Sequence, residues 1–173
     1  MTGLGGSLHR PLRGGSESSP ALFERLHDLP ADCVRDLLAD SEASGSRIVR
    51  RLVDEWADGT NRFDRLGEAL FAALIAGRLV GVCGLNVDPY AGDARIGRVR
   101  HLYVLTPLRR HGVGRRLVAR VIEAAGNRFE SLRLRTNNEA ASRLYEAIGF
   151  RARDEAGEYT HVMDLARRSR CAR

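Results

Sequence analysis

The sequence contains no lysine, so all 28 of its Lys and Arg positions are arginine. Against 22 Asp and Glu residues, these arginines give a formal net charge of +6 at pH 7. A positive surface of this kind favours anionic partners, either phosphate groups or nucleic acid. The absence of lysine also excludes a P-loop, because that nucleotide-binding motif places a lysine directly after its second glycine.

Cysteine is scarce as well. The three cysteines, Cys33, Cys83 and Cys171, lie far apart, and no Cys-x-x-Cys pair occurs. An odd and scattered set of thiols argues against a disulfide scaffold and against a zinc site, and it is typical of proteins in the reducing cytoplasm. We therefore expect a cytoplasmic protein with no bound metal.

Long hydrophobic runs are missing too: none approaches the roughly 18 residues of a membrane span, so we expect no membrane partner. The first 20 residues are rich in Gly, Ser and Arg and lack the apolar stretch of a signal peptide, which indicates a disordered N-terminal lead-in. With 173 residues, the chain is long enough for one domain with a proper core. We assign that domain to residues 21–166 and a basic tail to residues 167–173.

Hydrophobic periodicity and turn residues predict a strand, two helices, three strands, a helix, a strand, a helix and two final strands. The stretches that carry these elements, in chain order, are 21–30, 31–43, 46–59, 69–76, 79–87, 98–105, 113–126, 131–136, 136–150 and, for the last two strands, 150–166. We expect hairpin turns at Gly77-Arg78 and around Ala156-Gly157. The central strand-helix-strand unit must be parallel and right-handed. The predicted fold class is therefore α/β of the α+β type, a mixed, mostly antiparallel sheet with a central parallel strand-helix-strand unit and flanking helices.

The helix within residues 136–150 carries signals at both of its ends. Thr136 with Glu139 three residues later fits a capping box, whereas Asn138 is a competing cap. Gly149 predicts a left-handed exit from the helix.

The stretch RRHGVGRRL, residues 109–117, joins a strand to an amphipathic helix. Such a junction binds anions in general, because the first N–H groups of a helix are unpaired and the helix dipole adds positive potential. Glycine lets a phosphate approach the backbone, and flanking arginines add charge-assisted hydrogen bonds. The dinucleotide fingerprint Gly-x-Gly-x-x-Gly is not met, because Leu117 stands in place of its third glycine. On these residues alone, a phosphate site and a plain tight turn both remain open.

Two motifs taken together carry more information. The loop reads Arg109-x-x-Gly112-x-Gly114 after a Leu-Tyr-Val triplet and Pro107, and the stretch NNEAASRLYEAIGF follows downstream. This combination resembles the GNAT superfamily of N-acetyltransferases, whose acetyl-CoA loop is like the first motif. The second motif fits their pattern N-x-x-A-x-x-L-Y-x-x-x-G-F at Asn138, Ala141, Leu144, Tyr145, Gly149 and Phe150. The resemblance covers roughly residues 68–165.

The resemblance implies a GNAT-like form of this sheet, with acetyl-CoA as co-substrate. It implies that the CoA pyrophosphate lies on the loop residues Arg109, Arg110, His111, Gly112, Val113, Gly114 and Arg115. The pantetheine arm would pair with the strand at Leu102, Tyr103 and Val104, in a gap where that strand parts from 131–136. Asn138 would hydrogen-bond the pantetheine, the Val104 N–H would polarise the thioester carbonyl, and Tyr145 would protonate the departing thiolate.

The base that deprotonates the amine is left open by these motifs. Relatives often carry a glutamate on the strand before the loop, where this sequence has Arg98 and Arg100. The ordinary pKa of His101 suits the task, but strand alternation puts His101 on the face opposite Val104 if Val104 faces CoA. A water chain and the carboxylates of Asp88 and Glu68 are the alternatives.

The resemblance thus implies an acetyl-CoA-dependent N-acetyltransferase in which an amine attacks directly, on a small molecule or on the N-terminus or a side chain of a protein. The front helices and the segments 57–68 and 86–97 would form the acceptor pocket. Acidic residues in or near these segments would favour a cationic acceptor, unless they are simply solvated; they are Asp54, Glu55, Asp58, Asp64, Glu68, Asp88 and Asp93. Homodimers are common among such relatives, and this sequence leaves that state open.

Two other functions stay open. A non-catalytic acetyl-CoA-binding sensor would explain the missing strand glutamate. An Arg-rich nucleic-acid-binding module would explain the charge, but the aromatic residues do not cluster with the arginines, and neither a helix-turn-helix spacing nor a zinc motif is found. We therefore expect no nucleic-acid partner.

Overall fold

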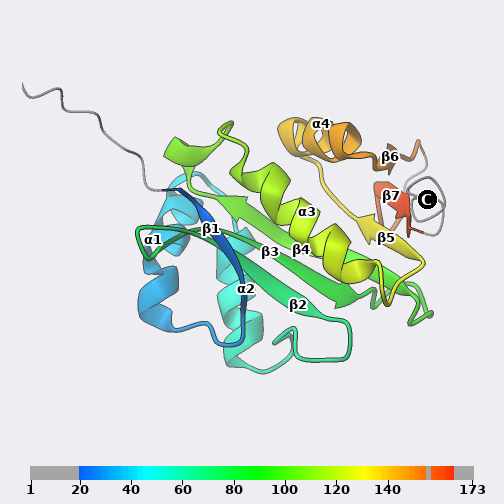
Figure 1. Cartoon of the computed structure of the whole chain (residues 1–173), viewed down its shortest axis with the longest axis horizontal. Helices are drawn as coiled ribbons and strands as arrows, with labels where there is room; N and C mark the ends of the chain where they lie inside the picture. Colours follow the sequence, from blue (N-terminus) through cyan, green and yellow to red (C-terminus); the bar gives the residue numbers. More distant parts are fainter. Residues whose placement is uncertain (1–19, 155–156, 166–173) are drawn as a thin grey trace, which may run out of the picture.

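The computed structural model describes residues 20–154 and 157–165. The expected lead-in (apart from Pro20), the expected basic tail and Cys171 lie outside these residues, and so does Ala156 of the expected last hairpin. Figure 1 shows the described chain as one sheet with helices on both of its faces. Within the described residues, no helix is both long and apolar enough to cross a membrane.

The helices and strands follow the predicted order. They are β1 (Leu22–Leu26), α1 (Ala31–Ala43), α2 (Ile48–Ala57), β2 (Ala69–Ile75), β3 (Arg78–Val87), β4 (Ile96–Val104), α3 (Val113–Ala125), β5 (Ser131–Leu134), α4 (Glu139–Ile148), β6 (Arg151–Ala152) and β7 (His161–Asp164). A short 3-10 helix, η1 (Thr106–Leu108), follows β4 and contains Pro107, which cannot donate a hydrogen bond to a strand ladder.

One sheet holds the strands in the order β1-β2-β3-β4-β5-β7-β6. Strands β4 and β5 pair in parallel, and the other neighbours pair antiparallel. This confirms the predicted mixed, mostly antiparallel sheet with a central parallel strand-helix-strand unit. The parallel pairing covers only Ile96–Arg98 opposite Ser131–Arg133. Beyond Arg98, none of the described residues pairs with β4 on this side, so the two strands part as expected.

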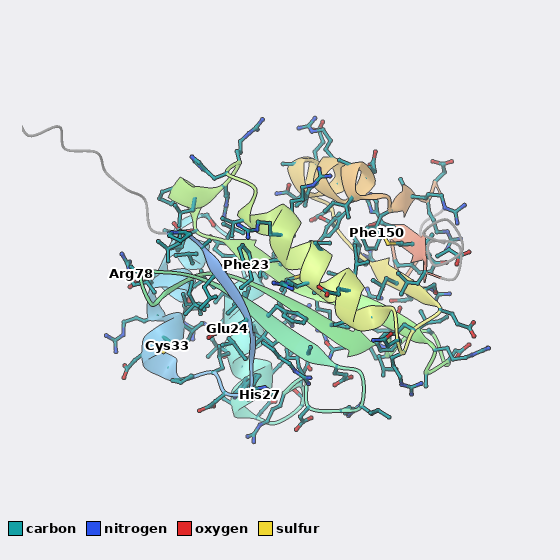
Figure 2. All side chains as sticks on the ribbon, in the orientation of Figure 1. Phe23, Glu24, His27, Cys33, Arg78 and Phe150 are labelled. Atoms are coloured by element: carbon teal, nitrogen blue, oxygen red, sulfur yellow. The ribbon has the colours of Figure 1, made fainter. Side chains whose placement is uncertain are left out.

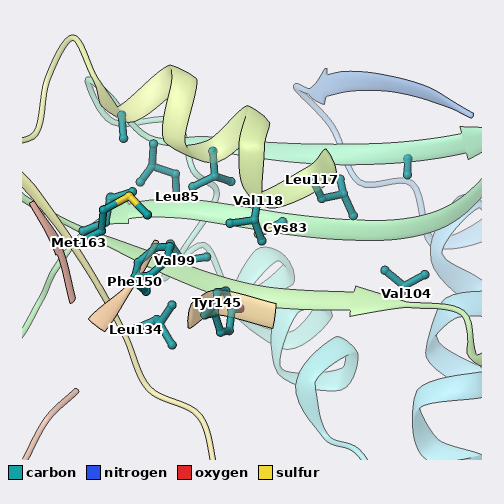
Figure 3. Close-up of a cluster of buried hydrophobic side chains, with 14 of the residues drawn as sticks. Cys83, Leu85, Val99, Val104, Leu117, Val118, Leu134, Tyr145, Phe150 and Met163 are labelled. Carbon is teal, nitrogen blue, oxygen red and sulfur yellow. The ribbon is translucent and has the colours of Figure 1, made fainter. Parts of the chain in front are cut away.

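Each face of the sheet has its own hydrophobic cluster. On the face covered by α3, Leu117 and Val118 pack with Cys83 of β3 and Val99 of β4 (Figure 3). On the opposite face, Leu37 of α1 and Leu52 of α2 are fully buried in a second cluster with Val82 of β3. Burying a side chain of this size stabilises the fold by about 1.5–3 kcal/mol, so these contacts fix both helical layers to the sheet.

The two described cysteines are unbridged thiols in different surroundings. Cys33 lies on the exposed side of α1, and Figure 2 places it at the opposite end of the molecule from Phe150. Cys83 is buried in β3, and burial raises the pKa of its thiol far above the ordinary value. A thiol in such surroundings stays protonated and chemically inert.

Two turns differ in detail from their predictions. In the β2–β3 hairpin, Ala76 and Gly77 have φ of 49° and 77°, so these two residues form the turn and Arg78 already opens β3. Positive φ at both central positions matches the twist of the flanking strands, and this places the turn one residue earlier than predicted.

At the start of α4, the competing cap is the one that forms. Asn138 Oδ1 accepts from the Ala141 N–H at 3.0 Å, while Thr136 Oγ1 accepts from the Asn138 N–H at 3.1 Å. The predicted capping box between Thr136 and Glu139 is therefore wrong, because the helix begins one residue after Asn138. The left-handed exit at Gly149 is confirmed by its φ of 112°.

Gly84 of β3 lies directly under an aromatic ring. A Cβ built on Gly84 would lie 2.6 Å from Phe63 Cζ and closer still to Phe63 Cε1. The Phe63 ring is buried and also meets the ring of His101 edge-on, with 6.0 Å between the ring centroids. The missing side chain at Gly84 therefore makes the space that seats Phe63 against His101.

The substitution Gly84→Ala should destabilise the protein by about 1–3 kcal/mol, because the added methyl group overpacks the Phe63 ring. Its Tm should fall by a few degrees in a calorimetric scan. Gly126→Ala is the matched control, since Gly126 has a φ of −59° and its new Cβ would lie 3.6 Å from the Glu123 carbonyl oxygen, an ordinary contact distance. Equal Tm values for the two variants would contradict the packing described here.

Candidate active site

One large groove of about 1650 Å³ crosses the parted region of the sheet. The end of β4, the loop before α3, the start of α4 and the exposed side of α2 all line it. Among the predicted site residues, the described lining includes Leu102, Tyr103, Val104, Arg109, Arg110, Gly112, Gly114, Arg115, Asn138 and Tyr145, but neither His111 nor Val113. The fold thus brings the two sequence motifs, which lie far apart along the chain, into one continuous surface.

The loop before α3 has the geometry of an anion cradle. Arg110 and Gly112 have φ of 67° and 82°, so the backbone turns sharply there, and the first intrahelical bond runs from the Arg116 N–H to the Gly112 carbonyl. The N–H groups of Val113, Gly114 and Arg115 in the first turn therefore precede the helix ladder. Among the described residues, no side chain caps this helix start and no acid lies in its first turn, so the positive end of the helix dipole is not neutralised there.

The open edge of β4 presents the backbone of Val104. The Leu105 N–H donates to Val80 of β3, and because strand N–H groups alternate in direction, the Val104 N–H points away from β3. The Val104 carbonyl, on the same open edge, accepts from Arg109 Nε at 3.0 Å. The Val104 N–H therefore faces the gap between β4 and β5, where the sequence placed it.

Tyr145 lies on α4 and lines the same groove. Its side chain is almost fully buried, and burial raises the pKa of its hydroxyl well above the ordinary value. Its ring packs edge-on against Phe150 with 5.5 Å between centroids. Behind α4, the buried His161 lies 3.0 Å from Ser142 Oγ and 2.9 Å from Thr160 Oγ1, which ties the helix to β7. His161 therefore has a structural position, and Tyr145 is the protonated hydroxyl on the groove wall.

A β-bulge interrupts β4 between Arg100 and Tyr103, opposite Cys83. Gly84 pairs with Arg100 and Val82 pairs with Tyr103, so one residue on β3 lies opposite two on β4. His101 absorbs the extra residue with a φ of 53°. The bulge turns Arg100 and His101 toward the same helix, α2, while Val104 packs in the cluster on the α3 face. His101 thus lies on the face opposite Val104, as strand alternation predicted.

The carboxylate that meets these two residues is Glu55 of α2. Glu55 Oε1 accepts from Arg100 Nη2 at 2.9 Å, and Glu55 Oε2 lies 3.1 Å from His101 Nε2 and accepts from Asn61 Nδ2 at 3.2 Å. Burial opposes ionisation, but the hydrogen bonds from His101 and Asn61 and the charge of Arg100 lower the pKa of Glu55 to about 2. Burial also lowers the pKa of His101 below 6.5. The pair therefore rests as a carboxylate beside a neutral imidazole.

Sequence reasoning named Glu55 only as one of several acidic residues near the pocket. A sharper signal was present, because Ile48, Leu52 and Glu55 follow the i, i+4, i+7 spacing of one helix face. A carboxylate on the side of a helix that meets the sheet needs partners there, and Arg100 and His101 supply them.

The two carboxylates that the sequence offered as a base are placed elsewhere. Asp88 is buried, with both its oxygens 3.3 Å from Arg98 Nη1. Glu68 is also buried and accepts from the Val87 N–H at 3.1 Å. Neither belongs to the lining of the groove, whereas Glu55 and His101 do.

Comparison with known proteins agrees with this geometry. A family model described as the acetyltransferase (GNAT) family matches residues 30–150. A solved structure from Exiguobacterium sp. 255-15, provisionally assigned as an acetyltransferase, is 30% identical and covers 89% of this chain and 99% of its own, with a TM-score of 0.77. A second, from Salmonella typhimurium, provisionally assigned as an acetyltransferase and solved with its cofactor acetyl-CoA, is 17% identical over 83% of this chain and 94% of its own, with a TM-score of 0.59. Because the identity is low, this second likeness concerns the fold alone.

A protein of Mycobacterium leprae, described as uncharacterised, also shares a segment with this chain. The two are 38% identical over 68 residues, which is 35% of this chain. The chain spans only 19% of the length of that protein.

Acidification should weaken the contribution of Glu55 to stability. Because the folded-state pKa of about 2 lies below the ordinary 4.5, this contribution is complete above pH 4.5 and is lost as the pH falls toward 2. The difference in unfolding free energy between the wild type and Glu55→Gln should therefore be smaller at about pH 3 than at about pH 5. Urea titrations at both pH values measure it. A difference that stays constant would mean that the carboxylate is not held as described.

Proposed function

Because the chain belongs to the acetyltransferase (GNAT) family, we propose that it transfers the acetyl group of acetyl-CoA to an amine. One observation carries the proposal: a single groove joins the anion cradle before α3, the open Val104 edge of β4 and the hydroxyl-bearing Tyr145. The Salmonella protein of the same fold, solved with acetyl-CoA, supports this choice of donor. The scarce, unpaired cysteines support a cytoplasmic location.

The residues of the groove fit acetyl-CoA at both ends. The N–H groups of Val113, Gly114 and Arg115 would hold the pyrophosphate, with the charges of Arg110 and Arg115 beside them. A Cβ built on Gly112 would meet nothing within 4 Å, so the loop surface is open where a phosphate would approach. The unpaired edge of β4 from Leu102 to Val104 would bind the amide-bearing arm as an added strand does. Asn138, which caps α4 at the groove wall, would contact the same arm.

The chemistry follows from two groups on opposite sides of the groove. When bound, acetyl-CoA supplies an activated acetyl thioester. The Val104 N–H would donate to the thioester carbonyl oxygen as negative charge develops there. The amine nitrogen would form a bond to the carbonyl carbon as the carbon–sulfur bond breaks. The Tyr145 hydroxyl would give its proton to the leaving sulfur, and the N–H proton that the new amide nitrogen loses would restore the Tyr145 hydroxyl. The raised pKa of Tyr145 keeps that proton in place at neutral pH.

The acceptor would enter from the α2 side of the groove, where Tyr90 and Glu55 line the wall. We propose a small-molecule amine or an amine of a protein N-terminus or side chain. One observation favours a second candidate, a sensor that binds acetyl-CoA without turnover: β4 carries Arg98 and Arg100 where relatives often have a glutamate. Binding without release of free thiol in the presence of amines would support that alternative.

Acetyl-CoA should raise the Tm of the protein in a concentration-dependent way. At a hundredfold excess over Kd, the gain in unfolding free energy should be about 2.7 kcal/mol.

Arg115→Glu should weaken the binding of acetyl-CoA at least about tenfold, since a carboxylate would stand beside the phosphates. Without ligand, the Arg115→Glu protein should be as stable as the wild type, because an acid in the first turn interacts favourably with the helix dipole. Arg120→Glu, on the exposed side of α3 and outside the groove, is the control. The donor assignment fails if millimolar acetyl-CoA leaves the wild-type Tm unchanged.

Tyr145→Phe should lower kcat on the order of a hundredfold or more, because the leaving thiolate loses its proton donor. The affinity for acetyl-CoA should stay as in the wild type, since the Phe ring keeps the contact with Phe150. Release of free thiol with a panel of primary amines measures kcat, and thermal shifts measure affinity. Tyr159→Phe is the matched control, because the Tyr159 ring packs between Arg133 and Arg153, away from the groove lining. A Tyr145→Phe enzyme as fast as the wild type would remove Tyr145 from this role.

A further inference from the structure

We infer that Glu55 and His101 together remove the proton of the acceptor ammonium, with Glu55 as the group that meets the ammonium and His101 as the group that holds the proton. The inference rests on the proposed acetyl transfer and names a base for it. It places that base partly on α2, a helix that the sequence motifs do not include.

Position is the first support. Both side chains line the same groove as Val104 and Tyr145. The Glu55 side chain keeps 21% of its surface exposed, whereas the His101 side chain keeps 4%. Glu55 is therefore the member open to a molecule in the groove, and His101 lies behind it. An ammonium that enters from the α2 side would meet the carboxylate first, on the face of β4 opposite the α3-side cluster that contains Val104.

Backbone geometry is the second support. The backbone of His101 lies in the left-handed region, at a φ of 53°, which residues other than glycine rarely adopt. Bulges often re-aim a side chain next to a functional site. Here the bulge turns both Arg100 and His101 toward one carboxylate, at 2.9 Å and 3.1 Å. A regular strand would have turned only one of them to that face.

The surrounding charges decide which group can keep the proton. From β4, the charge of Arg100 lowers the pKa of both groups. From α2, Glu55 raises the pKa of His101, Arg51 Nε lies 4.0 Å from Glu55 Oε1, and Asp58 directly follows the helix. A carboxylate with a pKa of about 2 is a weak base by itself. The imidazole, whose ordinary pKa is near neutrality, is the stronger base and starts neutral.

The proposed step balances as a single proton transfer. One N–H bond of the acceptor ammonium breaks, and its electron pair stays on nitrogen as the nucleophile. The proton passes by way of a Glu55 oxygen and ends on His101 Nε2, the ring nitrogen that faces Glu55, while the other ring nitrogen keeps the proton that the neutral imidazole carries. The pair begins as a carboxylate beside a neutral imidazole and ends as a carboxylate beside an imidazolium, so opposite charges then face each other across the 3.1 Å contact.

Two variants separate this role from a structural one. Glu55→Gln keeps the shape and loses the charge, and His101→Asn loses the imidazole but suits the left-handed backbone, because Asn tolerates that region. The acceptors are ethanolamine, lysine, spermidine and glucosamine, which carry ammonium groups at pH 7, and methoxyamine, which is neutral there. The readout is kcat/KM from thiol release across pH 5 to 9, with acetyl-CoA thermal shifts on the same samples.

Both variants should lower kcat/KM for the ammonium-bearing acceptors on the order of a hundredfold or more and change it little for methoxyamine, which has no proton to lose before attack. The wild type should lose activity on the acid side as His101 becomes protonated. That acid limb should move to lower pH in Glu55→Gln, because Glu55 raises the pKa of His101, and should vanish in His101→Asn. Glu123→Gln, which removes the partner of Arg120, is the control; both residues lie outside the groove lining, and this variant should behave as the wild type does.

Unchanged kcat/KM for the ammonium acceptors in both variants would overturn the inference and leave the acetyl transfer standing. An equal loss for methoxyamine would also overturn it, since that points to a structural role. If the wild type binds acetyl-CoA yet releases no thiol with any of the five amines, the proposed function fails, and the inference falls with it.

Discussion

The short parallel contact between β4 and β5 is the constraint on which the rest of this structure depends. It lasts from Ile96 to Arg98, after which β4 continues to Val104 with one edge unpaired. Exposed strand edges are costly, because unpaired N–H and C=O groups need other partners. Arg109 supplies one partner by donating to the Val104 carbonyl, and the neighbouring N–H is left for a ligand. The groove is therefore a consequence of where two strands stop pairing.

The parted edge is useful only if it is held still, and contacts from both faces hold it. On one side, Leu117 of α3 packs against the sheet in the larger hydrophobic cluster. On the other, Asp40 of α1 accepts from the Tyr103 hydroxyl at 2.8 Å and from the Thr106 N–H at 2.9 Å. Partial burial opposes ionisation of Asp40, yet these hydrogen bonds leave its pKa below the ordinary value. One carboxylate on α1 thus fixes the point where β4 ends and the chain turns toward the loop before α3.

Local patterns made much of this fold predictable, and contacts between distant residues set the rest. Helix periodicity, Gly149 and the loop around Gly112 act within a few residues, so the sequence alone indicated the element order and the cradle. The observed β2–β3 turn lies one residue before the predicted one, because the sequence does not show that Ala76 adopts a positive φ. Glu55 was missed as a partner of His101 because 46 residues separate them in the chain. Arg100 joins His101 on that face only because of the bulge in β4, which strand alternation cannot predict.

The arginines of β4 show how a chain without lysine arranges buried charge. A buried cation is costly unless a carboxylate meets it, and here each strand arginine has its own: Arg98 faces Asp88, and Arg100 faces Glu55. The two pairs differ in accessibility, because the Arg98 and Asp88 side chains are only 8% and 1% exposed while those of Arg100 and Glu55 are 22% and 21% exposed. In the first pair the carboxylate of Asp88 lies outside the groove lining. In the second pair the carboxylate of Glu55 belongs to the lining, so a helix, and not the strand, brings an acid to the groove.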